Sequence, residues 1–263
     1  MSDFDRTSNA REFSRKLTIA SWRCVAITLD PEGKRYKSFL RNNNHLQIET
    51  FHGFKGEDIP QDEIINRKLA TKELAVSPLL TPGAIGCAAS HKSIWNTAAT
   101  EGKGYFILED DCYTHQKITA FINDNLDLLM DIDICFFGIN TDSILQSISP
   151  LGLSSLSLFQ PKHPSEEWIK NALSKTNTKE VALHRLIKAF GFCAYFISPT
   201  GAKKLIEKIF PLSLETTNIP LITEKMPAIS IDRAGCREYP QLKACTCQPF
   251  LAYTPNINST TKK

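Results

Sequence analysis

The sequence predicts an α/β protein in which a mainly parallel, Rossmann-like sheet carries helices on both of its faces. One observation is that runs of strand length alternate four times with segments of helical period between residues 23 and 138. A second is that the runs YFIL and DICFFG are almost wholly apolar, as in strands that are buried on both faces. A third is the composition, since 42% apolar and 22% charged residues are ordinary for a globular protein. In such a fold, ligands bind at the carboxyl ends of the strands.

The first part of the chain supplies two strand and helix pairs. Residues 23–29 are apolar and β-branched, and after a turn the pattern of residues 34–43 is helical. Residues 46–52 predict a second strand, and residues 62–73 predict a second helix. Two parallel strands with crossover helices would follow from this order.

The next two pairs belong to the middle of the sheet. Thr81 and Pro82 form a favourable N-cap and first-turn pair, and they open a helix that we expect to reach about residue 100. Residues 105–108 then predict a buried strand, residues 118–130 a helix, and residues 133–138 another buried strand.

The second half is less regular. Residues 139–164 are rich in Ser, Leu and Pro without a clear period, so we expect a long loop there. Residues 192–197 predict a strand that is followed by a helix over residues 201–209, and short strands and turns are expected from residue 227 onward. The predicted organisation is a polar extension over residues 1–21, a single domain over residues 22–255 and a polar tail over residues 256–263.

The net charge indicates which classes of partner are excluded, and the cysteine content indicates the cellular compartment. The net charge of +3 is too small for a nucleic-acid-binding protein without a strongly basic face, although it permits contact with an anionic membrane surface. The first twenty residues do not resemble a secretory signal, and no apolar run is long enough to span a membrane. Three of the eight cysteines lie in apolar strand-like runs, where free thiols pack as small hydrophobic groups. We therefore expect a cytoplasmic protein, with the inner face of the membrane as an allowed site of action.

The most informative motif is the acidic triplet Glu109-Asp110-Asp111, which directly follows the strand YFIL. Adjacent carboxylates repel one another, and a divalent cation such as Mn²⁺ or Mg²⁺ would neutralise them with oxygen ligands. In an extended segment, Glu109 and Asp111 would face one ion while Asp110 points elsewhere. A solvated acidic turn that caps the next helix fits the triplet alone equally well.

Other clusters have simpler interpretations. His91 lies on an apolar stripe of the helix that begins at Thr81, four residues after Cys87, and this pattern is typical of a buried core histidine. Ser90 and His91 gain a functional role only if this part of the helix faces the acidic strand end. The spacing of three late cysteines is not that of a familiar zinc site, so ordinary reduced thiols are favoured, and three lysines of a later helix predict a solvated face. These residues are Cys236, Cys245 and Cys247, and Lys203, Lys204 and Lys208.

Several motifs in order resemble glycosyltransferase family 25, which includes lipooligosaccharide galactosyltransferases and collagen-modifying relatives. The motifs are ITLDPEGKR, HGFKGEDI, GAIGCAASHKSIW, ILEDD, DICFFG and AYFISPTGAKKLIE, and the resemblance runs from about residue 23 to about residue 260. It implies a GT-A fold and inverting transfer of a hexose, galactose or glucose, from a UDP-sugar to a hydroxyl. A glycan or lipid-linked glycan, such as lipooligosaccharide, is the implied acceptor.

The resemblance also suggests roles for individual residues. The acidic triplet resembles the metal-binding D-x-D element, with Glu109 in the first acidic place and Asp111 as the second ligand. We expect donor binding by residues near the strand ends, namely Thr28, Arg35, Ser90, His91 and Asp110.

Inverting transfer also needs a base near the acceptor hydroxyl. Asp232 is the first candidate because it follows the short apolar run AISI in a region where the family carries an acidic residue, with Glu224 and Glu238 as rivals. An ion pair of Asp232 with Arg233 or Arg237 at a turn is at least as good an interpretation.

Two other functions use the same residues. A metal-dependent enzyme acting on phosphate esters would need the carboxylates but no acceptor pocket. A non-catalytic protein that binds nucleotide sugars would keep the fold without turnover.

Overall fold

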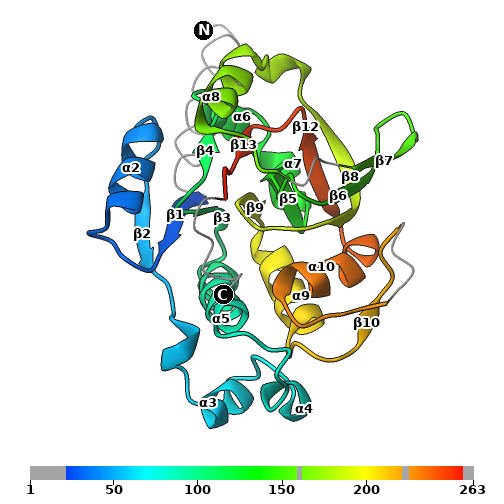
Figure 1. Cartoon of the computed structure of the whole chain (residues 1–263). Helices are drawn as coiled ribbons and strands as arrows, with labels where there is room; N and C mark the ends of the chain where they lie inside the picture. The colour runs from blue at the N-terminus through cyan, green and yellow to red at the C-terminus, as the bar shows by residue number, and fades with distance from the viewer. Residues whose placement is uncertain (1–21, 159–161, 221–224, 257–263) are drawn as a thin grey trace, which may run out of the picture.

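The computed structural model describes residues 22–158, 162–220 and 225–256, and a nine-stranded sheet forms its centre (Figure 1). The order of the strands across the sheet is β2-β1-β3-β9-β5-β12-β8-β6-β7. Their bounds are β1 Trp22–Thr28, β2 Glu49–His52, β3 Gly104–Glu109, β5 Ile134–Gly138, β6 Ile144–Ile148, β7 Ser154–Leu158, β8 Ala182–Ala189, β9 Ala194–Ile197 and β12 Ala244–Gln248.

The sheet is mixed. β1 pairs in parallel with both β2 and β3, and β5 pairs in parallel with β12. β9 lies antiparallel between β3 and β5, and β8, β6 and β7 continue the far edge in antiparallel fashion. Six of the nine strands thus point the same way, but only three of the eight pairs of neighbouring strands are parallel. The α/β class is confirmed, and the antiparallel strands are what a prediction from strand and helix alternation misses.

The central strands are buried on both faces, as the continuous apolar runs predicted. In β3, Tyr105 and Ile107 face one core layer, while Phe106 and Leu108 face the other. The first layer is covered by α5 (Pro82–Glu101), α9 (Pro199–Ile209) and α10 (Ile231–Glu238), and the second by α2 (Lys34–Asn42), α6 (Ile118–Asp124) and α7 (Leu126–Asp131). Helices therefore lie on both faces of the sheet.

Smaller elements complete the described part of the chain. The helices are η1 Gly56–Asp58, α3 Gln61–Asn66, α4 Lys72–Ala75, α8 Glu166–Lys175, η2 Thr178–Glu180 and η3 Tyr239–Gln241. Two short antiparallel pairs consist of β4 Tyr113–Thr114 with β13 Ala252–Tyr253, and β10 Thr216–Thr217 with β11 Met226–Pro227.

The caps of α5 are the ones that its sequence predicts. The Thr81 hydroxyl accepts a hydrogen bond from the backbone N–H of Ala84, and Pro82 occupies the first turn. The helix ends at Gly102, whose φ of 67° is the left-handed conformation that glycine adopts without strain. Helix α9 begins in the same way, with Ser198 accepting from the N–H of Gly201.

Gly201 marks the closest approach between α9 and the sheet. A Cβ atom at this position would lie 1.7 Å from the backbone oxygen of Asp133, at the start of β5. The absent side chain is therefore what lets the first turn of α9 rest on the sheet.

Several predicted elements differ from the observed ones. The loop expected over residues 139–164 contains the hairpin of β6 and β7, whose Ser and Leu residues alternate at an edge where apolar burial gives little signal. The helix expected over residues 62–73 is divided into α3 and α4 around Lys68, which has a φ of 51°. The helix expected over residues 118–130 is interrupted at Asn125.

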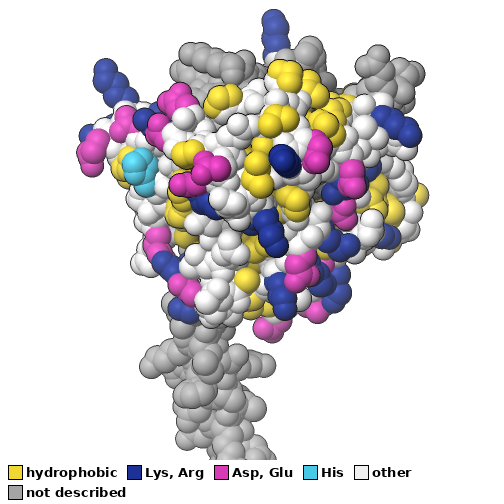
Figure 2. Space-filling model, turned by 90° about the horizontal axis from the view of Figure 1, so that it is seen from below, with side chains coloured by type: hydrophobic (Ala, Val, Ile, Leu, Met, Phe, Trp, Pro, Cys, Tyr) yellow, Lys and Arg dark blue, Asp and Glu magenta, His cyan; other side chains and the backbone are white. Residues whose placement is uncertain are grey.

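The expected extension over residues 1–21 and all of the expected tail except Asn256 lie outside the described residues. Within the described ranges, no helix combines the length and the apolar character needed to cross a membrane. On the face drawn in Figure 2, acidic and basic side chains are interspersed among the coloured residues, without a broad area of one sign.

Candidate active site

The acidic triplet lies at the carboxyl end of β3, near the middle of the sheet. Glu109 is the last residue of the strand, and the N–H of Cys112 donates to the carbonyl of Glu109 at 3.1 Å, so the chain turns immediately. The alternation expected of an extended segment is therefore wrong here. Asp110 and Asp111 approach the same cation, the Arg35 guanidinium, instead of facing different ways.

Arg35 and Thr28 bind the triplet from neighbouring elements. Nη2 of Arg35, in the first turn of α2, lies 2.7 Å from Oδ1 of Asp110 and 3.2 Å from Oδ2 of Asp111. The hydroxyl of Thr28, at the end of β1, donates to Oδ2 of Asp110 at 2.6 Å and accepts from the N–H of Asp30 at 3.2 Å. The structure thus brings together three of the residues that we predicted for donor binding.

Asp111 is the most deeply placed carboxylate of the triplet. Its side chain is 9% exposed, and its Oδ1 atom has no hydrogen-bond partner among the described residues. Burial and the neighbouring Glu109 raise the pKa of Asp111 from 3.8 to about 6, while Arg35 and the Thr254 hydroxyl oppose this rise. A buried carboxylate oxygen without a donor fits a hard divalent cation as its ligand.

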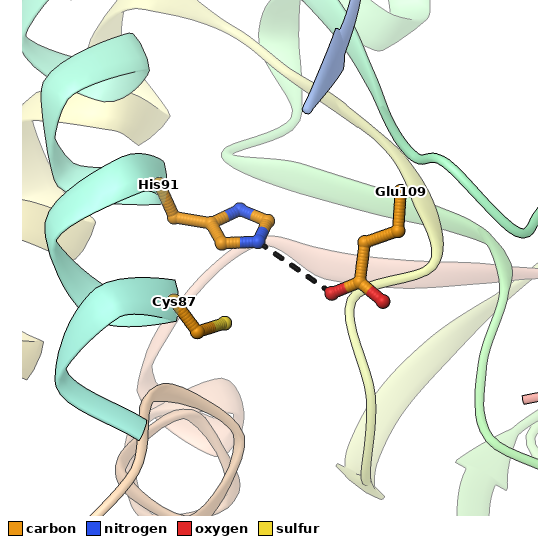
Figure 3. A group of neighbouring side chains, drawn as sticks. All are labelled: Cys87, His91 and Glu109. Carbon is orange, nitrogen blue, oxygen red and sulfur yellow. Dashed lines mark ion pairs between the residues drawn. The ribbon is translucent and has the colours of Figure 1, made fainter. Parts of the chain in front are cut away.

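Glu109 faces α5 rather than Arg35. Figure 3 shows its carboxylate directed at the ring of His91, with Nε2 and Oε1 3.7 Å apart, and Cys87 one helical turn below. The ring of His91 is 1% exposed, and its Nδ1 lies 2.6 Å from the Tyr195 hydroxyl. That hydroxyl accepts a hydrogen bond from Trp95 Nε1 at 2.8 Å. His91 is thus both a buried histidine and a residue that faces the acidic strand end.

Cys87 is the site residue that our sequence reasoning left without a role. The ligand atoms of Cys87, His91 and Glu109 all lie within 4.8 Å of one another. The signal in the sequence was the spacing of four between Cys87 and His91, which places both side chains on one helix face.

The adjacent face of α5 serves packing. The Ser90 hydroxyl donates to the carbonyl of Gly86 at 2.8 Å and accepts from the N–H of Phe54 at 2.9 Å. A Cβ atom on Gly86 would lie 2.5 Å from the carbonyl oxygen of Phe54. Ser90 therefore holds the loop after β2 against the helix, and its contacts do not support direct donor binding.

Asp232 lies in the first turn of α10 and not after a strand, which corrects the expected context. Its Oδ1 accepts hydrogen bonds from the Ser230 hydroxyl and from the N–H of Arg233, the latter at 2.9 Å. α10 packs against α5, and the pKa of Cys87 is raised by burial, by Glu109 and by Asp232. Asp232 is thus electrostatically linked to the region around the acidic strand end.

The rival bases have other surroundings. Glu238 is 8% exposed and pairs with Arg237 Nε at 2.7 Å and with Lys208 at 3.8 Å, so its carboxylate is neutralised at the far end of α10. Arg237 also pairs with Glu215 instead of Asp232. Glu224 lies outside the described residues.

The other clusters singled out in the sequence are structural. Cys236 packs in one core layer and donates to the Ala189 carbonyl at 2.8 Å, whereas Cys245 and Cys247 lie in the other layer. The three thiols therefore do not converge on one ion. Lys204 is not merely solvated, because its Nζ lies 2.8 Å from Oδ1 of the buried Asp133.

A known family and a known relative are similar to parts of this chain. The family model described as glycosyltransferase family 25 (LPS biosynthesis protein) matches residues 26–219. A protein of Acanthamoeba polyphaga mimivirus named "Putative glycosyltransferase R655" is 38% identical over 75 residues, which are 27% of this chain and 22% of the relative. The match to that relative thus spans about a fifth of its length. Thr28, Arg35 and the acidic triplet fall within the region matched by the family model, whereas Asp232 lies beyond it.

Proposed function

This chain belongs to glycosyltransferase family 25, and on that premise we propose that it transfers a sugar from a nucleotide donor to an acceptor hydroxyl. The observation that carries the proposal is the acidic triplet at the carboxyl end of β3, bound by Thr28 and Arg35 from the adjacent β1 and α2. Ligands of α/β sheets bind at this edge. The proposed donor is UDP-galactose or UDP-glucose.

Donor binding is assigned to two groups of residues. Thr28 and Arg35 fix the orientation of Asp110, and Arg35 also offers its guanidinium to a phosphate oxygen. Asp111 would hold a divalent cation together with Glu109, whose negative charge is close enough to raise the pKa of Asp111. The Oδ1 atom of Asp111 has no hydrogen-bond partner among the described residues, and the triplet carries more negative charge than Arg35 balances. Mn²⁺ or Mg²⁺ would supply positive charge for the departing diphosphate.

His91 has a positioning role in this proposal. Its ring is buried and its two nitrogens face Tyr195 and Glu109, so the ring orients the Glu109 carboxylate and does not contact the donor. Ser90 likewise acts on the loop after β2 through the N–H of Phe54.

Asp232 is the proposed general base. The acceptor oxygen attacks the anomeric carbon, the bond from that carbon to the phosphate oxygen breaks, and the nucleoside diphosphate leaves with the electron pair. The proton of the acceptor hydroxyl passes to the Asp232 carboxylate, whose Oδ1 is held by Ser230 and Arg233. Direct displacement on the opposite face inverts the anomeric configuration. A glycan or lipid-linked glycan is the proposed acceptor, and the cytoplasmic side of a membrane is the proposed location.

Calorimetric titration with UDP-sugars tests the proposal. We expect binding in Mn²⁺ and little binding in EDTA, because the triplet repels the diphosphate without a cation. Asp111→Asn should lose this dependence, whereas Asp131→Asn, at an exposed site on α7, is the matched control and should keep it.

Product analysis then separates the alternatives. Transfer to an added glycan supports the proposal. Hydrolysis of simple phosphate esters without glycan transfer would contradict it, and so would donor binding without any turnover across a panel of acceptors.

A further inference from the structure

Cys87, His91 and Glu109 form a cluster with three different kinds of metal-binding atom. Cys87 and His91 lie one turn apart on α5, and Glu109 ends β3 opposite them (Figure 3). The thiol is partly buried, the imidazole is buried, and the carboxylate side chain is 34% exposed. Two rigid elements therefore hold the cluster, and it is open to solvent on the side of Glu109.

The separations suit a tetrahedral transition-metal ion. Zinc bonds to sulfur, nitrogen and oxygen of about 2.0 to 2.3 Å place two ligand atoms about 3.3 to 3.6 Å apart. His91 Nε2 and Glu109 Oε1 are 3.7 Å apart, and no pair of ligand atoms in the cluster exceeds 4.8 Å. Rotation about the side-chain bonds of Cys87 and Glu109 can close the remaining difference.

The charges around the cluster favour a cation. Among the described residues, the Glu109 carboxylate forms its ion pair with His91. The carboxylate of Asp232 adds a second negative charge that acts on Cys87. Arg35, a basic partner of the triplet, pairs with Asp110 and Asp111.

The outer contacts resemble those of a metal-bound histidine. The Nδ1 atom of His91 is 2.6 Å from the Tyr195 hydroxyl, and Trp95 Nε1 holds that hydroxyl from the other side. A hydrogen bond at one ring nitrogen orients the ring and fixes the other nitrogen for a metal.

We propose that Cys87, His91 and Glu109 bind a thiolate-preferring transition metal of the zinc class, with a fourth position open to water or another ligand. Oxygen-preferring ions such as Mg²⁺ would not select this set of donors. The binding itself does not depend on glycosyl transfer. Because Glu109 is also a proposed ligand of the donor cation, zinc at this site would compete with the donor complex and inhibit transfer.

Cobalt(II) titration of the full chain tests the site directly. With EDTA-treated protein in a non-thiol reductant, we expect a thiolate-to-cobalt charge-transfer band and intense visible bands of tetrahedral cobalt. Cys87→Ser should abolish the charge-transfer band, whereas Cys245→Ser, a half-buried cysteine in the opposite core layer, should keep it. Tyr195→Phe should keep the band but weaken affinity roughly 10- to 100-fold, as is usual for loss of an outer hydrogen bond.

A second measurement uses the unsubstituted chain, so its result does not depend on whether the variants fold. In the unsubstituted chain, zinc should slow alkylation of Cys87 by iodoacetamide while leaving Cys245 unchanged. Absence of the charge-transfer band, or equal alkylation of Cys87 with and without zinc, would overturn the proposal and leave His91 and Glu109 as a simple ion pair. A protein that transfers sugar in Mn²⁺ but shows no cobalt band would refute only this site, and the reverse result would refute only the proposed function.

Discussion

Asp111→Asn should make the protein more stable at neutral pH while it abolishes transfer. The pKa of Asp111 is about 6 in the folded chain against 3.8 without burial. The folded state therefore binds more protons than the unfolded state between these values, and stability falls as the pH rises from about 4 to about 6. Above pH 6, the ionised Asp111 lowers the free energy of unfolding.

The magnitude follows from the shift. About two pKa units, at about 1.4 kcal/mol per unit, correspond to about 3 kcal/mol at pH 7. The side chain is only 9% exposed, so solvent screening reduces this little. Asparagine has nearly the same shape and carries no charge, and it should recover most of the cost.

Urea denaturation in EDTA from pH 4 to pH 7.5 measures the effect. The difference in unfolding free energy between variant and parent should rise from near zero at pH 4 to about 3 kcal/mol at pH 7. Taking this difference removes the titration of groups that do not interact with Asp111. Asp131→Asn, at a side chain that is 73% exposed, should differ from the parent by less than about 1 kcal/mol throughout. A flat or negative difference for Asp111→Asn would refute the inference that burial of its charge is costly.

Three further substitutions test the remaining assignments. Asp232→Asn should lower turnover by about 10²-fold or more with donor affinity near that of the parent, because a base acts in the transition state; unchanged turnover in steady-state kinetics would remove it as the base. Ser90→Ala should cost about 1 to 3 kcal/mol in thermal or chemical unfolding, since it leaves the Phe54 N–H unpaired, and a lost donor affinity with unchanged stability would contradict its packing role. Gly201→Ala should cost about 3 kcal/mol or more, because the new Cβ meets the Asp133 carbonyl, and a calorimetric melting temperature equal to that of the parent would argue against this contact.

Local signals in the sequence were sufficient for the elements that carry strong patterns. The N-cap at Thr81 and the apolar run before Glu109 gave the helix and the strand that frame the site, and both are confirmed. Thr28 and Asp110 lie together because β1 and β3 are neighbouring parallel strands, whose carboxyl ends share one edge. The sequence predicted both strands but not that they are neighbours.

Contacts that depend on turns and on distant segments could not be read in this way. The turn closed by Cys112 redirects Asp111, and a strand pattern contains no sign of it. Arg35 reaches across from α2 to two carboxylates more than seventy residues away. Cys87 comes close to Glu109 only when α5 packs against the end of β3. The sequence therefore shows the spacing of Cys87 from His91 but not the cluster that the three residues form.

The close contact at Gly201 shows that a residue in a family motif can be required for packing and not for activity. The motif AYFISPTGAKKL is one of the most specific parts of the sequence, yet its glycine is required by the distance between α9 and the start of β5. Gly86, in the motif GAIGCAASHKSIW, is constrained in a similar way by the loop after β2. A descendant that had lost turnover would still need both glycines to fold. Family membership therefore reports inherited architecture, whereas activity would depend on the roles proposed for Glu109, Asp111 and Asp232.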